Sequence, residues 1–139
     1  MENKDSTLTF TQGVHHVGLT VANLMQVRGF FIDVLGFKQV GEKPDYPAVF
    51  VSDGEVMITL WQATSPESAT AFDRHNSIGL HHLALAVPDI ARLNALHQRL
   101  CEVDSLVIEF SPEPLGGGPT QHMMCAIPGG IRLEFIARA

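Results

Sequence analysis

Two histidine doublets occupy equivalent places in two similar stretches of this chain. His15 and His16 lie in "GVHHVGLTV" (13–21), and His81 and His82 lie in "GLHHLALAV" (79–87). Imidazole nitrogens bind divalent metals, and an imidazole can also exchange a proton near neutral pH. The doublets are therefore either incidental polar residues at strand ends or a means of directing imidazoles toward one shared site.

The alternation of side chains along a strand separates the two members of each doublet. Successive residues of a strand point to opposite faces, and the apolar residues after each doublet define the face that packs on a helix. His16 and His82 fall on the other face, and so does Glu134 in the last strand-like run, "GGIRLEF". His15 and His81 fall on the apolar side, and we assign them no chemistry.

Two histidines and one carboxylate on a common face form a recognised ligand set for a divalent metal. Neutral imidazoles supply nitrogen donors, the carboxylate offsets part of the metal charge, and coordination positions stay open for substrate or water. The pattern favours a metal on His16, His82 and Glu134. The alternative is that the three are ordinary polar residues lining a cavity.

Each doublet begins the same series of elements. The first is followed by a helical pattern over 24–35 that ends at Gly36, and the second by one over 90–100 with Asp89 as its N-cap. Three strand-like runs follow each helix, at 37–42, 48–53 and 55–62 and at 105–110, 121–127 and 131–137. The sequence thus predicts an α+β domain at 13–139, made of two βαβββ modules (13–62 and 79–137) joined by a linker (63–78), after a flexible arm at 1–12.

The composition excludes several classes of protein. A net charge of −6 argues against a general nucleic-acid binder, which needs a basic face. No apolar run approaches the roughly 20 residues that span a bilayer, and the first residues lack a signal-peptide pattern. Two cysteines do not make a disulfide framework, so we expect both to be reduced and buried in a cytoplasmic protein.

The paired βαβββ pattern, with "VLGF" closing the first helix and "GGIRLEF" in the last strand, resembles the vicinal oxygen chelate superfamily. That superfamily includes glyoxalase I, extradiol dioxygenases, fosfomycin-resistance enzymes, methylmalonyl-CoA epimerase and bleomycin-resistance proteins. The resemblance implies a curved mixed sheet around a cavity, a small-molecule substrate and a homodimer. It also places His16, His82 and Glu134 at the metal-ligand positions of the family. Whether the modules pair within one chain or by exchange between subunits stays open, and exchange would draw the ligands from two subunits.

The position that corresponds to Glu134 in the first module is Thr59. Glyoxalase I and the epimerase carry glutamate or glutamine there, whereas fosfomycin-type enzymes and extradiol dioxygenases use two histidines and one glutamate. The resemblance therefore favours a metal-dependent enzyme with an oxygenase-like reaction and Fe(II) or Mn(II), although Zn, Ni or Mg would also fit. The alternatives are a lyase, an isomerase or a thiol-transferase, or a non-catalytic, resistance-type protein that binds a small molecule.

Further residues share the polar face of the predicted strands. His122 is a candidate proton shuttle beside the metal, or else a hydrogen-bonded residue of the wall. The residues predicted to line the substrate cavity are Met57, Thr59, Trp61, Met124 and Arg132. Arg132 either meets an anionic substrate or is held in a salt bridge.

Overall fold

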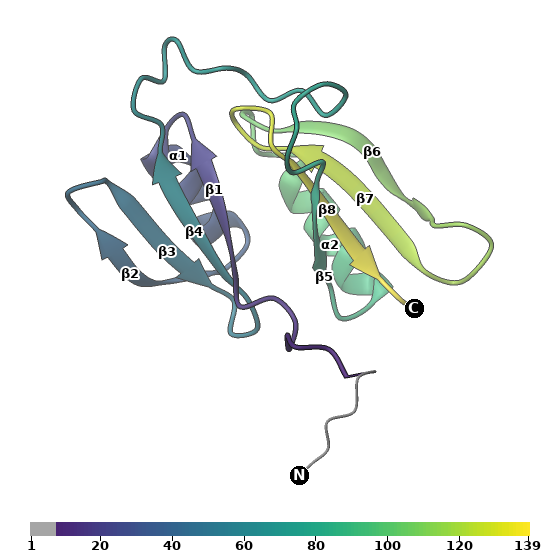
Figure 1. Cartoon of the computed structure of the whole chain (residues 1–139). Helices are drawn as coiled ribbons and strands as arrows, with labels where there is room; N and C mark the ends of the chain where they lie inside the picture. Colours follow the sequence, from purple (N-terminus) through teal and green to yellow (C-terminus); the bar gives the residue numbers. More distant parts are fainter. Residues whose placement is uncertain (1–7) are drawn as a thin grey trace.

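The computed structural model describes residues 8–139, which form two similar halves (Figure 1). The first half consists of β1 (His16–Val21), α1 (Leu24–Gly29), a π-helical turn η1 (Phe30–Val34), β2 (Lys38–Lys43), β3 (Ala48–Ser52) and β4 (Met57–Gln62). The second half consists of β5 (Leu83–Ala86), α2 (Ile90–Leu100), β6 (Val107–Pro114), β7 (Gln121–Ala126) and β8 (Arg132–Ala137). This order confirms the predicted α+β fold of two βαβββ modules.

The strands form two four-stranded mixed sheets, one in each module. Their orders are β1-β4-β3-β2 and β5-β8-β7-β6, with β1 parallel to β4, β5 parallel to β8, and the other pairs antiparallel. Strand β1, which begins at His16, and strand β5, which follows His82, are thus edge strands, and the described strands do not join into one continuous sheet (Figure 1). Alternation along a strand fixes which side chains share a face but does not fix which strand lies beside an edge.

Local signals in the sequence explain where the helices begin and end. The Asn23 side chain accepts a hydrogen bond from the Gln26 amide at 3.1 Å, and the Asp89 side chain accepts one from the Arg92 amide at 2.8 Å. The second contact confirms Asp89 as an N-cap. Gly36 follows η1 with a φ of 84°, a left-handed conformation that favours glycine and ends the helix.

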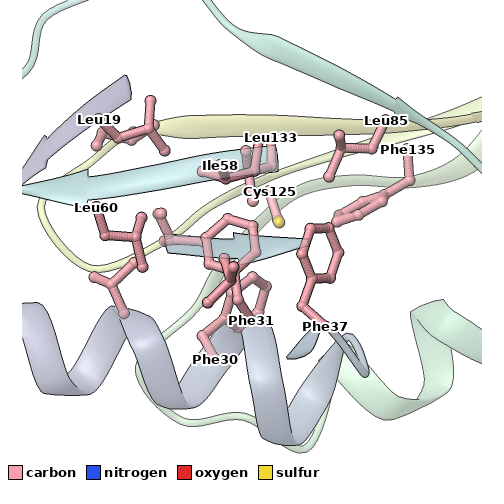
Figure 2. Close-up of a cluster of buried hydrophobic side chains, with 14 of the residues drawn as sticks. Leu19, Phe30, Phe31, Phe37, Ile58, Leu60, Leu85, Cys125, Leu133 and Phe135 are labelled. Carbon is pink, nitrogen blue, oxygen red and sulfur yellow. The ribbon is translucent and has the colours of Figure 1, made fainter. Parts of the chain in front are cut away.

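The apolar faces of both sheets and the helices share one hydrophobic core (Figure 2). Phe31, Ile58 and Leu133 are fully buried in it, and burial of each such side chain contributes about 1.5–3 kcal/mol. Arg99 of α2 also joins the modules, because its Nη1 donates a hydrogen bond to the Val34 carbonyl of η1 at 3.1 Å. The core therefore holds the two modules together.

Three other features bear on the expectations from the sequence. Residues 1–7 of the predicted arm lie outside the described residues, while residues 8–12 are exposed and form neither helix nor strand. Cys125 is buried as expected, but the expectation for Cys101 is wrong, because it follows the last turn of α2 and is exposed. Among residues 8–139, no helix is long and apolar enough to cross a membrane.

Candidate metal centre

The Glu134 carboxylate lies between two imidazoles. Its Oε1 is 3.0 Å from Nε2 of His82, and its Oε2 is 2.6 Å from Nδ1 of His122. Glu134 is only 8% exposed, and a carboxylate so far from water needs partners of this kind. The fold thus brings together two of the three predicted ligands, and it adds His122, the candidate proton shuttle.

The strand register explains why these side chains meet. Ala84 of β5 lies opposite Glu134 of β8, so His82, two residues before Ala84, is directed to the same face as the carboxylate. On the other side of β8, Met124 of β7 lies opposite Glu134, and His122 precedes it by two residues. Met124 is buried, and its predicted place in the wall of the substrate cavity stays a prediction.

His16 lies apart from this group. Its ring contacts His15 edge-on, with 5.2 Å between ring centroids and 2.9 Å between the two Nδ1 atoms. Within residues 8–139, no three or more histidine, cysteine, aspartate or glutamate side chains are placed to hold a metal ion. The third predicted ligand is therefore not brought to Glu134 by its own chain.

The donors around Glu134 nevertheless suit a divalent ion. Two species can join an imidazole nitrogen to a carboxylate oxygen at close range, namely a proton on the nitrogen or a metal ion bound by both. With the proton, Nε2 of His82 would donate to the Glu134 oxygen that lies 3.0 Å away. With a metal, the neutral Nε2 and the carboxylate would serve as nitrogen and oxygen ligands. Two of the three predicted ligands thus fit the group.

Thr59 occupies the place of Glu134 in the first module. Gly18 of β1 lies opposite Thr59, just as Ala84 of β5 lies opposite Glu134. Thr59 is 3% exposed, and its Oγ1 accepts a hydrogen bond from Nε1 of Trp61 at 2.8 Å. The hydroxyl is therefore already engaged within the first module, and no fourth carboxylate or amide ligand is present at this position.

Aromatic rings cover the corresponding face of the first module. The Trp61 ring lies 4.7 Å from Tyr46 and 5.8 Å from Phe50, measured between centroids. Gly41 gives Phe50 room, because a Cβ at Gly41 would come within 2.9 Å of the Phe50 ring. Met57, also predicted to line the cavity, is half-buried at the start of β4. The first module thus offers an aromatic and apolar surface, and the second offers the titratable groups.

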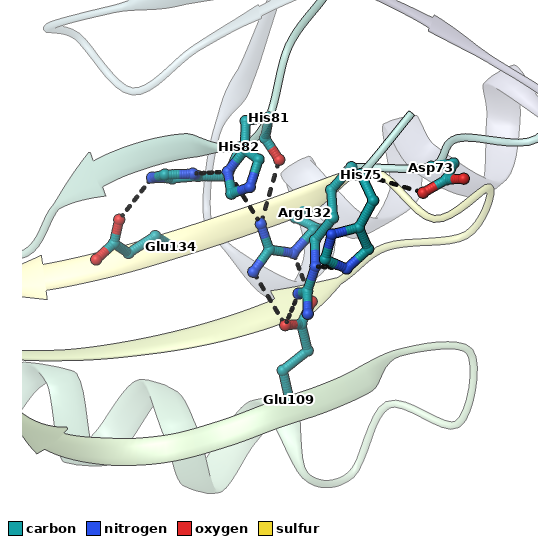
Figure 3. Close-up of polar contacts among 8 residues, drawn as sticks. Asp73, His75, His81, His82, Glu109, Arg132 and Glu134 are labelled. Atoms are coloured by element: carbon teal, nitrogen blue, oxygen red, sulfur yellow. Dashed lines mark hydrogen bonds and ion pairs between the residues drawn. The ribbon is translucent and has the colours of Figure 1, made fainter. Parts of the chain in front are cut away.

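Arg132 is held by other protein groups. It is 8% exposed, and its Nε and Nη2 donate to the two carboxylate oxygens of Glu109 at 2.7 and 3.0 Å (Figure 3). Its Nη1 lies 3.3 Å from both the carbonyl oxygen and Nδ1 of His81. Arg74 adds a third hydrogen bond to Glu109, at 2.7 Å. The salt-bridge alternative for Arg132 thus describes the structure, and its predicted contact with substrate stays a prediction.

The sequence did not indicate that Glu109 and His81 belong to this network. Hydrogen bonds from Arg132 and then Arg74 hold the pKa of Glu109 below its ordinary value, despite the opposing effect of partial burial. Desolvation of the ring and the positive charge of Arg132 lower the pKa of His81. Simple alternation assigned His81 to the apolar side, and the β-bulge that directs Glu109 toward Arg132 leaves no clear mark in the sequence.

Comparisons with known proteins agree with this architecture. The family model described as "Glyoxalase/Bleomycin resistance protein/Dioxygenase superfamily" matches residues 13–135. A glyoxylase/bleomycin resistance protein/dioxygenase domain from Frankia sp. EAN1pec is 23% identical with a TM-score of 0.79, over 93% of this chain and 99% of that one. No curated protein matches the sequence.

Two further solved structures share the fold at lower identity. A lactoylglutathione lyase from Agrobacterium tumefaciens is 20% identical with a TM-score of 0.68, over 93% of this chain and 96% of that chain. The fosfomycin resistance protein FosX from Listeria monocytogenes is 12% identical with a TM-score of 0.72, over 94% and 96% of the two chains. At these identities the likeness establishes the fold and leaves the reaction open.

Proposed function

Because the chain belongs to the glyoxalase, bleomycin resistance protein and dioxygenase superfamily, we propose that it is a divalent-metal-dependent enzyme. Its substrate is a small molecule that chelates the metal through two adjacent oxygens. The observation that carries this proposal is the buried Glu134 carboxylate, which faces Nε2 of His82 at 3.0 Å. His82 and Glu134 would hold the metal, with His16 as the third protein ligand.

In this proposal the third ligand comes from a second copy of the chain, in a homodimer. Support comes from the separation of His16 from Glu134 and from the edge positions of β1 and β5. The faces of these strands that carry the histidines expose small side chains, which are Gly18 and Thr20 in β1 and Ala84 and Ala86 in β5. A flat face of small residues beside an unpaired strand edge can accept another sheet closely.

The protein groups have distinct roles in this site. His122 holds Oε2 of Glu134 and leaves Oε1 for the metal, while the aromatic face around Trp61 excludes water and packs against the apolar part of the substrate. The bound metal would act as a Lewis acid that stabilises negative charge on the substrate oxygens. An oxygenase-like reaction is preferred because three protein ligands leave the most positions open and Thr59 adds none. Fe(II) or Mn(II) suits that reaction.

The test is metal analysis of protein purified without a chelator. The wild-type protein and a His15→Ala control should retain a divalent metal, because His15 is not a ligand in this proposal. His16→Ala, His82→Ala and Glu134→Gln should each lose it. Full metal occupancy in His82→Ala or Glu134→Gln, with the fold intact by circular dichroism, would refute the proposed ligand set.

A mixing experiment tests whether the ligands come from two chains. The His16→Ala chain keeps His82, and the His82→Ala chain keeps His16. If the site is shared, a heterodimer of the two variants rebuilds one complete site and regains up to half of the wild-type metal content. If each chain holds its own metal, mixing restores nothing, and the two-chain part of the proposal fails.

A second candidate is a protein that binds a small apolar molecule without turning it over. The aromatic surface of Tyr46, Trp61 and Phe50 supports it, since such a surface can hold a planar ligand without a metal. Trp61 is the single tryptophan of the chain, so its fluorescence reports on this surface directly. Ligand affinity that survives complete removal of metal, with no turnover by metal-loaded protein, would favour this candidate.

Turnover by metal-loaded protein that forms lyase, isomerase or thiol-transfer products would exclude the oxygenase-like reaction.

A further inference from the structure

The hydrogen bonds around His81 determine which nitrogen of His82 carries a proton. A guanidinium group only donates hydrogen bonds, so Nδ1 of His81 is the acceptor in its 3.3 Å contact with Nη1 of Arg132, which also reaches the His81 carbonyl oxygen at 3.3 Å. The same Nδ1 lies 2.9 Å from Nδ1 of His82 (Figure 3). One of two nitrogens at that distance must donate, and the guanidinium beside His81 favours the proton on Nδ1 of His82.

This proton position decides the role of the other ring nitrogen. With Nδ1–H directed at His81, Nε2 is the nitrogen of His82 that faces Glu134. It is also the nitrogen whose proton a metal can replace while the Nδ1–H bond stays in place. Metal-binding histidines commonly donate their second N–H to a neighbouring group, which fixes the tautomer and the ring orientation.

We propose that Glu109 and Arg132 are positioning residues, which act through His81 to keep the proton of His82 on Nδ1 and to direct its Nε2 at the metal. The proposal rests on the proposed metal site. Arg132 directs two of its three nitrogens at Glu109 and the third at His81, so the carboxylate sets the orientation of the guanidinium. Because Arg132 is buried, it has few other orientations in which its charge is compensated.

The geometry of β6 delivers Glu109 to this network. In the β6–β7 ladder Ile108 lies opposite Cys125 and Phe110 lies opposite Met124, so Glu109 is an extra residue at a bulge. Bulges redirect side chains and are frequent beside functional sites. Figure 3 shows the Glu109 side chain extending from β6 across the sheet to Arg132.

The first module provides a natural comparison. It has the same histidine doublet, with 2.9 Å between Nδ1 of His15 and Nδ1 of His16, and the same bulge, with Val40 as the extra residue. The register places Met57 where the second module has Arg132. Valine and methionine thus replace the glutamate and the arginine, and no guanidinium fixes the direction of the hydrogen bond in the first doublet.

The test exchanges the pair for that of the first module, in Glu109→Val/Arg132→Met. NMR of the full-length, metal-free protein labelled with ¹⁵N on histidine measures the ¹⁵N–¹⁵N coupling across the His81–His82 hydrogen bond. The wild type should show a protonated Nδ1 on His82 coupled to an unprotonated Nδ1 on His81. The double variant should lose this signature, and its affinity for Zn²⁺, used as the probe, should fall about 10- to 100-fold.

Controls separate positioning from a general loss of structure. Arg74→Ala removes a hydrogen bond from the same carboxylate without touching His81, so the coupling and the Zn²⁺ affinity should be unchanged. The signals of His15 and His16 should stay constant in every folded variant. If the double variant does not fold, Glu109→Gln replaces it and should show a partial loss of the coupling.

Two results distinguish this inference from the proposed function. A wild type that shows the coupling and loses it in the variant, yet binds no Zn²⁺, supports the positioning role and refutes the metal site. A wild type that binds Zn²⁺ and whose His82 signals and affinity are unchanged in the folded variant overturns the positioning role alone.

Discussion

Substitutions of Glu109 and Arg132 should affect stability in a strongly non-additive way. Glu109→Val leaves the buried Arg132 cation without a carboxylate and removes three charge-assisted hydrogen bonds, of 2.7, 3.0 and 2.7 Å. Breaking a fully buried ion pair costs about 3–5 kcal/mol, but the Glu109 side chain is 25% exposed, so we expect about 2–3 kcal/mol. Arg132→Met leaves a carboxylate that can reach water and Arg74, and should cost about 1–2 kcal/mol.

The double variant Glu109→Val/Arg132→Met should lose less free energy of unfolding than Glu109→Val alone. It installs the apolar pair that the first module uses at the same place, and replacing a buried ion pair by apolar residues is often close to neutral. We therefore expect a loss of about 1 kcal/mol or less and a coupling energy of about 2–4 kcal/mol. Urea denaturation, followed by circular dichroism for the wild type and the three variants, measures this cycle.

The pH dependence of the free energy of unfolding provides a second test of the role of Glu109. The pKa of Glu109 lies below its ordinary value of 4.5 in the folded protein, so the unfolded chain binds more protons in this range. The stabilisation is complete above the unfolded pKa and is lost as the pH falls through the folded pKa. The difference between wild type and Glu109→Val should therefore shrink in acid. Losses that simply add in the double variant, or a difference that does not change with pH, would refute the reasoning.

Three further predictions concern other parts of the fold. Burial raises the pKa of the Cys125 thiol to about 12, so a thiol reagent at neutral pH should label the exposed Cys101 and not Cys125, as mass spectrometry can show. Phe31→Ala empties a fully buried position and should cost about 3–5 kcal/mol in urea denaturation; a loss under 1 kcal/mol would contradict the packing. Gly18→Ala places a Cβ within 3.3 Å of the Trp61 indole nitrogen and should shift the tryptophan fluorescence, whereas an unchanged spectrum would place the ring elsewhere.

Particular residues show why so much of the fold could be predicted. The doublets marked the repeat, Gly36 and Asp89 marked helix ends, and the alternation after His16 is visible in the burial of β1. These are local signals, because each depends on a few neighbouring residues and on backbone geometry. Alternation along β8 also placed Glu134 on the face that meets His82.

Those local signals could not predict the contacts around Arg132. A single inserted residue at the β6 bulge changes which side chains of that strand face Arg132, so Glu109 reaches it only once the β6–β7 register is known. The donor role of Arg132 toward His81, which orders the protons of the doublet, likewise depends on distances between distant segments.

The repeated βαβββ modules and the faces on which His82 and Glu134 lie follow from the sequence alone, because strand and helix periods are properties of the local chain. The folded arrangement is what brings these two side chains together, leaves His16 apart from them, and lets Trp61 donate a hydrogen bond to Thr59. Those facts depend on how sheets and modules pack. That packing is set by the shape of the shared core and by the free strand edges, and the spacing of residues along the sequence does not predict it.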